Sequence, residues 1–326
     1  RAKEDLGFEF ATDDPNELFA ADNIDIINVC TPNNLHKDHV IGALKAGKHV
    51  YCDKPLTATY EESEEILKVL GSTKAITQMA FQNRFFPATM RAKELIEAGF
   101  LGEVLSFRAS YLHSGSVDPE RPMGWKLEKS AGGGVLADLG SHVLDLIYHL
   151  LGRYKEVFAY NRILYPKRLH PSGKMVDVEA EDLSLLIVKM ENGSVGTIES
   201  SKIATGTNDE LIFEIHGTKG AMRFNMMDPN WLEVYDNTLP ETDLGGDRGF
   251  KKIECVQRYK SPGGKFVAPK APIGWIRSHV HSLYNFLDNV YNLRPSVPSI
   301  EDGAYIQYVI EMAHRSHRTK QWVTLD

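Results

Sequence analysis

The sequence predicts a two-part α/β protein, with a parallel sheet followed by a larger α+β region built on a mostly antiparallel sheet. In the first eighty residues, short β-branched runs recur about every 25 residues with helical patterns between them, as in βαβ crossovers. After residue 85, long alternating runs follow one another through short turns, which is typical of antiparallel hairpins. We therefore expect domains over residues 1–84 and 85–326.

The parallel part is expected to begin with a short helix over 1–6 and a short strand over 8–10. Strands are then expected at 24–30, 49–52 and 75–80, with helices at 35–46 and 59–70 between them. Ligands bind beyond the carboxyl ends of strands in such sheets. Those ends are the tripeptides Thr31-Pro32-Asn33, Asp53-Lys54-Pro55 and Gln82-Asn83-Arg84.

The glycine-rich turn of a dinucleotide-binding half does not occur in these residues. No G-x-G-x-x-G follows a strand, and the sequence begins at Arg1 in the tail of a helical pattern. A complete half needs a strand, a glycine-rich turn, a helix and a second strand, roughly 30–40 residues, ahead of this point. We therefore expect the first β-α-β unit to be missing from the printed sequence.

The second part is expected to form a large open sheet with few covering helices. Its strands are predicted at 104–112, 157–165, 183–190, 195–201, 211–216, 221–225 and 231–235. Helices are predicted at 88–98, 276–289 and 302–314, with a last strand at 322–325. Residues 237–274 are rich in Gly, Pro and Lys and indicate a long excursion.

A polar stripe on a predicted helix is the main candidate for chemistry. After three glycines, residues 135–151 have a helical pattern in which Asp138, His142, Asp145 and His149 share one face. Carboxylates and imidazoles exchange protons near neutral pH, whereas an ordinary solvated face carries Lys, Glu and Gln. A solvated polar face is the alternative, but glycines at the start of the helix favour a close approach by backbone or ligand.

Composition excludes several classes of protein. A net charge of -7 without a Lys/Arg run gives no case for nucleic acid, and no run of 18 apolar residues predicts a membrane span. The odd number of cysteines, Cys30, Cys52 and Cys255, indicates reduced thiols in a cytoplasmic protein. The His/Asp stripe is explained without a metal, so we expect no metal site.

Four blocks along the chain resemble the Gfo/Idh/MocA oxidoreductases, in the family's order. They are Cys30-Thr31-Pro32-Asn33 with His36, then Gly47-Lys48-His49-Val50 leading to Asp53-Lys54-Pro55, then Asn83-Arg84-Phe85 with Pro87, and Gly132-Gly133-Gly134 through Asp138, Gly140, His142 and Asp145. The family usually has Glu before Lys-Pro, where this chain has Asp53. The resemblance implies a Rossmann-type parallel sheet, here lacking its first β-α-β unit, and NAD or NADP as cofactor.

The resemblance also implies roles for individual residues. Lys54, Asp138 and His142 are expected to be catalytic, with His142 as general base because its intrinsic pKa suits proton transfer near pH 7. The expected cofactor-binding residues are Thr31, Pro32, Asn33, His36, Asp53, Lys54, Arg84 and Trp125. Two alternatives stay open: Arg84 instead bridges the domains, and Trp125 is a hydrophobic plug.

The predicted activity is NAD(P)-dependent hydride transfer between nicotinamide and a secondary alcohol of a sugar, polyol or inositol-like substrate. Two alternatives are an NAD-dependent glycoside hydrolase of the same family and a non-catalytic nucleotide-sensing protein. Retention of Lys54, Asp138 and His142 argues against the sensor. We further expect a homodimer or homotetramer that forms through the C-terminal sheet.

Overall fold

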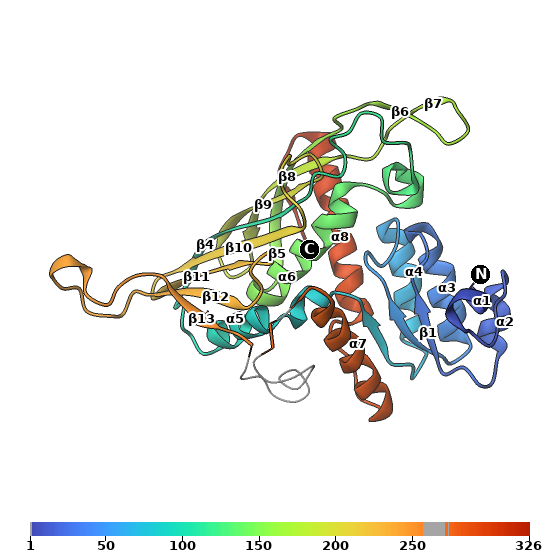
Figure 1. Ribbon diagram of the computed structural model, residues 1–326, viewed down its shortest axis with the longest axis horizontal. Coiled ribbons are helices and arrows are strands. Elements are labelled where there is room, and N and C mark those ends of the chain that lie inside the picture. The colour runs from blue at the N-terminus through green and yellow to red at the C-terminus, as the bar shows by residue number, and fades with distance from the viewer. Residues whose placement is uncertain (1, 257–270, 273) are drawn as a thin grey trace.

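The two larger sheets of the described residues lie end to end, with helices between them. The computed structural model describes residues 2–256, 271–272 and 274–326. Figure 1 shows the N-terminal parallel part, in blue, at one end and the large sheet, green to orange, at the other. The predicted excursion at 237–274 lies partly outside the described residues, and the part that is described includes the strand β13 (Lys251–Glu254).

The parallel part contains three strands in the order β1-β2-β3. They are β1 (Ile26–Val29), β2 (His49–Cys52) and β3 (Thr77–Met79), with α3 (Asn33–Lys45) and α4 (Tyr60–Leu70) as the crossovers. Val29 pairs with Cys52 and Cys52 with Met79, so the strands end at one edge. A capping box between Thr59 and Glu62 begins α4. These predicted crossovers are confirmed.

The residues ahead of β1 differ from the prediction. The helix α1 (Ala2–Leu6) is present, but residues 8–10 form no strand, and α2 (Pro15–Ala20) follows instead. Phe8 and Phe10 alternate with a polar residue as in a strand, yet both side chains are exposed. Alternation alone is not enough, because a strand also needs a neighbour with which to pair its backbone.

Among the residues that the structure describes, the second sheet has nine strands in the order β13-β12-β11-β10-β4-β9-β8-β5-β14. Its other strands are β4 (Val104–Leu112), β5 (Tyr154–Arg162), β8 (Leu183–Met190), β9 (Val195–Ser201), β10 (Glu210–Gly217), β11 (Gly220–Asn225), β12 (Trp231–Asp236) and β14 (Val323–Thr324). All neighbours are antiparallel except β4 and β9. The prediction of a mostly antiparallel open sheet is confirmed.

Two details of this region differ from the expectation. Strand β5 begins at Tyr154, three residues before the predicted start, because the ring of Tyr154 is buried and its hydroxyl donates to the Leu144 carbonyl. A small hairpin of β6 (Lys167–Leu169) and β7 (Met175–Asp177) lies within a stretch where no strand is predicted.

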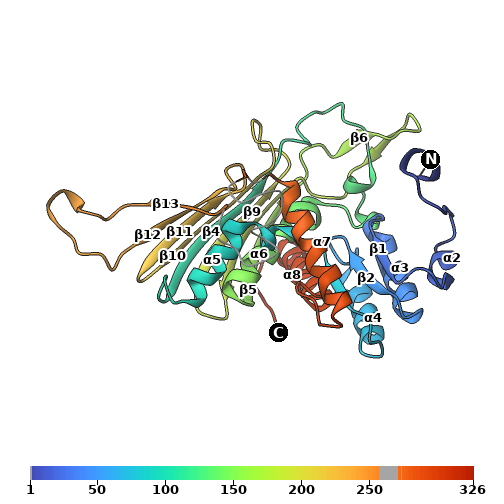
Figure 2. The same ribbon diagram turned by 60° about the horizontal axis from the view of Figure 1, so that its bottom comes forward.

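One face of the nine-stranded sheet is covered by helices. Figure 2 shows α5 (Pro87–Glu97), α6 (Ser141–Leu151) and α8 (Ile300–Thr319) on that side. Along β8, buried and exposed residues alternate, so every second side chain enters the core. The other side chains leave Leu185 and Ile187 exposed on the opposite face.

The C-terminal helices pack on the parallel part as well as on the large sheet. In α7 (Ile276–Tyr291), Phe286 lies 5.4 Å from Tyr51 between ring centroids, and Ser282 hydrogen-bonds the Tyr51 hydroxyl. The amide of Met79 in β3 donates to the carbonyl of Pro298, just before α8. The predicted domain boundary at residue 84 assigns α7 and α8 to the second domain. In space, however, both helices also pack against the parallel sheet of the first domain.

Candidate active site

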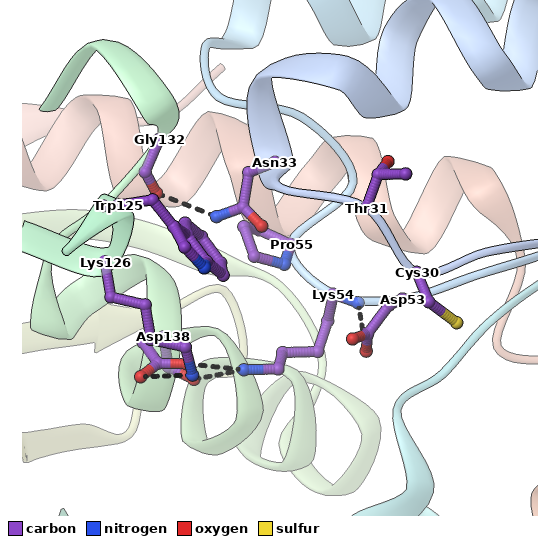
Figure 3. A pocket seen from close by; sticks show the side chains of 11 residues that line it. Cys30, Thr31, Asn33, Asp53, Lys54, Pro55, Trp125, Lys126, Gly132 and Asp138 are labelled. Atoms are coloured by element: carbon purple, nitrogen blue, oxygen red, sulfur yellow. Dashed lines mark hydrogen bonds and ion pairs between the residues drawn. The ribbon is translucent and has the colours of Figure 1, made fainter. Parts of the chain in front are cut away.

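A pocket opens where β1 and β2 end, between the parallel sheet and the start of α6. It is lined by Cys30, Thr31, Asn33, Asp53, Lys54, Pro55, Trp125, Lys126, Gly132, Gly133 and Asp138. Figure 3 shows how the labelled side chains converge on the pocket. Two of the three expected strand ends thus contribute to one site, as expected for the carboxyl edge of a parallel sheet. The other wall comes from the loop and turn that precede α6.

Lys54 and Asp138 meet across this pocket. The Lys54 ammonium donates to the main-chain carbonyl of Asp138 at 2.6 Å and to Oδ1 at 3.1 Å, as Figure 3 shows. The backbone amide of Lys54 donates to Oδ1 of Asp53 at 2.8 Å, which orients the start of the lysine side chain. The peptide bond between Lys54 and Pro55 is cis.

Two further lysines contact the same carboxylate. Lys126 lies 3.1 Å from Oδ1 of Asp138, and Lys202 lies 2.8 Å from Oδ2. Burial alone would raise the pKa of Asp138, but Lys54, Lys202 and Lys126 outweigh it and hold that pKa well below its usual range. Asp138 is therefore an anion throughout the physiological range of pH.

The turn that carries Asp138 is not part of a regular α-helix. Leu136–Gly140 forms a π-helical turn, and the α-helix α6 begins only at Ser141. Glu181 accepts a hydrogen bond from the amide of Leu136, and a Cβ on Gly134 would lie 2.6 Å from the same carboxylate. The prediction of one regular helix over 135–151 is wrong at its start, because this buried glutamate and the glycine contacts impose a wider turn.

The predicted polar stripe is divided between two environments. Asp138 lines the pocket, whereas Asp145 accepts two hydrogen bonds from the Arg84 guanidinium in the interior. His149 is largely removed from water near Arg84, and burial lowers its pKa to about 3. The π-helical turn changes the angular spacing, so the four residues do not share one solvated face.

His142 is buried, and its Nδ1 has no hydrogen-bond partner among the described residues. Its ring lies 5.7 Å from the ring of Tyr111 on β4. Burial, followed by the positive charge of Lys54, lowers the pKa of His142 well below its ordinary value. The imidazole is therefore neutral near pH 7, the form that can accept a proton.

Several of the expected cofactor-binding residues hold the strand ends together. Asn33 donates from Nδ2 to the Gly132 carbonyl at 2.8 Å, which joins α3 to the glycine loop. The ring nitrogens of His36 lie 3.0 Å from the Pro55 carbonyl and 2.8 Å from the Thr31 carbonyl. A Cβ on Gly132, whose φ is +78°, would lie 2.8 Å from the Cβ of Asn33. The glycines thus allow a close approach by protein atoms.

The remaining expected residues have different positions. Pro32 immediately precedes α3, and neither Pro32 nor His36 lines the pocket. Arg84 also lies outside it: besides Asp145, its guanidinium contacts Asp302 of α8 at 3.3 Å, which fits the alternative of a bridge. Trp125 lines the pocket with its ring partly exposed, and the Lys126 ammonium lies 5.6 Å from the ring centroid.

Sequence reasoning missed three residues near the site. Lys126 and Lys202 contact Asp138 from distant parts of the chain, and no local motif marks either of them. His279 of α7 contributes to the lowered pKa of His142, and its buried Nε2 has no partner among the described residues. A single histidine on a helix face carries no local signal that would place it beside His142.

Neither a three-ligand metal cluster nor a membrane-spanning helix is found among the described residues. Within residues 2–256 and the described part of the C-terminal segment, no group of three His, Cys, Asp or Glu side chains is placed to hold a metal ion. Over the same residues, no helix combines the length and apolar character needed to cross a bilayer.

Models of known families match most of the chain. Residues 1–81 match an oxidoreductase family with an NAD-binding Rossmann fold, and residues 89–223 match the GFO/IDH/MocA C-terminal domain. Levoglucosan dehydrogenase of Pseudarthrobacter phenanthrenivorans is 31% identical over 332 residues, which cover 98% of this chain and 84% of that protein. Myo-inositol 2-dehydrogenase of Thermotoga maritima is 29% identical, with 99% and 86% of the two chains covered.

Solved structures lead to the same group. A structure of levoglucosan dehydrogenase in complex with NADH and levoglucosan has a TM-score of 0.93 and 31% identity, and covers 99% of this chain and 86% of that one. A second structure of that enzyme, with NADH and L-sorbose, has a TM-score of 0.92 and 32% identity, and covers 100% of this chain and 86% of that one.

Proposed function

Since the chain belongs to the GFO/IDH/MocA family of NAD-dependent oxidoreductases, we propose that it oxidises a ring hydroxyl of an anhydrosugar or inositol. One observation carries the proposal: Lys54 and Asp138 pair at 3.1 Å in a pocket at the carboxyl ends of parallel strands, with neutral His142 one helical turn further on. Relatives named for levoglucosan and myo-inositol support a cyclic, polyhydroxylated substrate.

The pocket residues suit a nicotinamide ring. Trp125 and Pro55 offer flat apolar surfaces, while Thr31, Asn33 and Asp53 provide polar groups at the strand ends. We assign these five residues and Lys54 to cofactor contact, with Pro32 and His36 shaping the loops behind them. When bound, NAD would supply the acceptor for the carbinol hydrogen, which leaves carbon as a hydride carrying both electrons of the C–H bond.

Residues of the protein accept the hydroxyl proton and stabilise the negative charge on the reacting oxygen. Loss of hydride turns the C–O bond into a carbonyl, so the hydroxyl proton must leave, and neutral His142 receives it. The Lys54 ammonium donates to the reacting oxygen and stabilises the negative charge that develops there. Asp138, held as an anion, orients that ammonium through two contacts.

We also propose that a second copy covers the outer face of the nine-stranded sheet. Leu185, Ile187 and Tyr160 are each 41% or more exposed there, around a groove of about 550 Å³. Contiguous apolar surface of this kind favours association. Ile187→Glu should lower the mass measured by light scattering, and a wild-type monomer would contradict the proposal.

No disulfide bond joins Cys30, Cys52 and Cys255, which all lie within the described residues, and this fits the reducing environment of a cytoplasmic enzyme. This supports our proposal of a cytoplasmic location. Fractionation of cells that express the protein would test it.

A substrate panel tests the proposed activity. Levoglucosan, L-sorbose, myo-inositol and scyllo-inositol are each incubated with NAD or NADP, and absorbance of the reduced cofactor is followed. We expect NADH to form in a one-to-one ratio with a ketone product from at least one cyclic polyol. A parallel incubation with aryl glycosides covers the hydrolase alternative: free aglycone without NADH would replace our proposal with glycoside hydrolysis.

A further inference from the structure

Lys202 is a buried lysine that directly follows β9, far in sequence from the other site residues. Its side chain is only 10% exposed, and its ammonium lies 2.8 Å from Oδ2 of Asp138. Of the three lysines on this carboxylate, it is the most buried, since Lys54 is 13% and Lys126 47% exposed. It is also the one supplied by the nine-stranded sheet.

The three lysines contact different sets of oxygen atoms of Asp138. Lys202 occupies Oδ2, while Lys54 contacts Oδ1 and the main-chain carbonyl of Asp138. Lys126 contacts both oxygens at 3.1 and 3.2 Å, but its side chain is 47% exposed. A carboxylate fixed at Oδ2 cannot rotate freely, so Oδ1 stays directed at Lys54.

The backbone around Lys202 makes it a rigid support. Its amide donates to the Asp182 carbonyl at 2.8 Å, and its own carbonyl accepts from the Ser116 amide at 2.8 Å. Both main-chain groups are therefore bonded to other segments of the large-sheet region. A group held in this way can position a neighbour more accurately than a side chain on a mobile surface.

Stability alone does not account for this lysine. One carboxylate cannot neutralise three ammonium groups, and a buried ion pair often stabilises a fold no better than apolar side chains of similar volume. Burial lowers the pKa of Lys202, while Asp138 opposes that shift and Lys126 and Lys54 add to it. The charged form of Lys202 therefore depends on Asp138.

We propose that Lys202 is a positioning residue for alcohol oxidation, which fixes Asp138 so that Lys54 directs its ammonium at the substrate oxygen. The inference rests on the proposed function. Lys202 acts through Asp138, so removing it should slow the chemical step without weakening the binding of substrate or cofactor.

The test compares Lys202→Met, Lys202→Gln and Lys202→Arg with the wild-type enzyme on its best panel substrate. We expect Lys202→Met to lower kcat by about 10- to 100-fold, since a small misplacement of a reacting group has that effect, with little change in KM. The primary deuterium isotope effect on kcat should increase, because hydride transfer becomes more rate-limiting. Lys202→Arg should recover most of the activity, and NADH affinity by calorimetry should stay near the wild-type value in all three.

A double-mutant cycle makes the test specific. In an Asp138→Asn background, Lys202→Met should have almost no further effect on kcat, because the carboxylate through which Lys202 acts is already absent. Lys93→Met is the matched control: Lys93 pairs with Glu97 at 3.5 Å on α5, outside the site, and this variant should keep full activity. If Lys202→Met does not fold, Lys202→Gln carries the same comparison.

Three results would overturn the inference. A raised substrate KM with unchanged kcat would make Lys202 a direct substrate contact, and additive effects of Lys202→Met and Asp138→Asn would remove Asp138 as the intermediary. Failure of the wild-type enzyme to form NADH with any substrate refutes the proposed function itself. A normal kcat in Lys202→Met beside an active wild-type enzyme overturns only the role of Lys202.

Discussion

Two carboxylates seven residues apart, Asp138 and Asp145, both pair with cations but in contrasting environments. Asp138 lies at a pocket and contacts three lysines, one of which is 47% exposed. Asp145 is 1% exposed and accepts both hydrogen bonds from the fork of Arg84. Arg84 also reaches Asp302 of α8, so this second cluster joins three segments of the chain.

The difference separates a chemical role from a structural one. At Asp138, the lysine ammonium groups have further N–H donors that can turn toward a ligand. The three positive charges also keep the Asp138 carboxyl ionised. At Asp145, the planar guanidinium is matched by the carboxylate, whose side chain is only 1% exposed. Burial raises the pKa of Asp145 to about 6 although Arg84 opposes that shift, which reflects how little water reaches it.

The largest expected effect is on the pocket side. His142→Ala should lower kcat by about 10²–10⁴-fold, the usual contribution of a positioned general base, and leave cofactor affinity nearly unchanged. Steady-state kinetics and calorimetry check the two parts. Turnover close to wild type would remove His142 from the mechanism.

At the buried cluster of Arg84, Asp145 and Asp302, Arg84→Met should lower the free energy of unfolding. The substitution leaves the Asp145 carboxylate buried without its partner, and breaking such a pair costs about 3–5 kcal/mol. Urea unfolding followed by circular dichroism measures the loss. A change below about 1 kcal/mol, the range of exposed pairs, would mean that the cluster is not structural.

His149 and Asp145, which lie near Arg84, should also make the stability of the fold depend on pH. Burial lowers the pKa of His149 to about 3, against about 6.5 in the unfolded chain, so below pH 6.5 the unfolded state binds a proton that the folded state does not. His149 thus makes the free energy of unfolding fall as the pH drops from about 6.5 toward 3. Asp145 acts in the opposite direction between about pH 6 and 4, because its folded form binds the proton first.

His149→Gln isolates the first of these contributions. The slope of the unfolding free energy against pH reports how many protons the protein takes up when it unfolds. Between pH 7 and 5, measured by urea titrations, the variant should take up fewer protons than the wild type, by up to one. An unchanged slope would show that His149 is not buried in its neutral form.

The smallest expected effect concerns the edge of the pocket. Asn33→Ala removes the hydrogen bond to the Gly132 carbonyl, which should cost about 1 kcal/mol of stability. Because the glycine loop then loses its link to α3, the KM for NAD should rise a few-fold while kcat changes less. A greater loss of kcat than of cofactor affinity would place Asn33 nearer the chemistry than we propose.

Much of the fold and part of the pocket could be predicted from hydrophobic periodicity and from the rule for parallel strand ends. The predicted bounds of β4, β8 and β9 agree with the structure, because their alternation reflects one buried and one exposed face. The carboxyl ends of β1 and β2 do form a shared site, since parallel strands bring their ends to one edge. The same rule predicts that Thr31, Asn33, Asp53 and Lys54 lie together, and all four line one pocket.

What could not be predicted depends on contacts between distant segments. Lys202 reaches Asp138 only because β9 lies beside β8 and β4 in the sheet, an order that local patterns do not specify. The π-helical turn at Leu136–Gly140 depends on Glu181, more than forty residues away. The partner of Arg84 was likewise open, since a guanidinium at a strand end suits a ligand as well as a buried carboxylate.

The most direct test of the contrast is to measure Lys54→Met and Arg84→Met side by side, for both kcat and the free energy of unfolding. Lys54→Met should lower kcat by about 10²–10³-fold, as loss of a donor to a developing oxyanion does, and keep its stability because Lys126 and Lys202 still neutralise Asp138. Arg84→Met should show the reverse, with a large loss of stability and a kcat near wild type for the folded fraction. A stable Arg84→Met enzyme without activity, or an active Lys54→Met enzyme, would contradict the separation of the two sites.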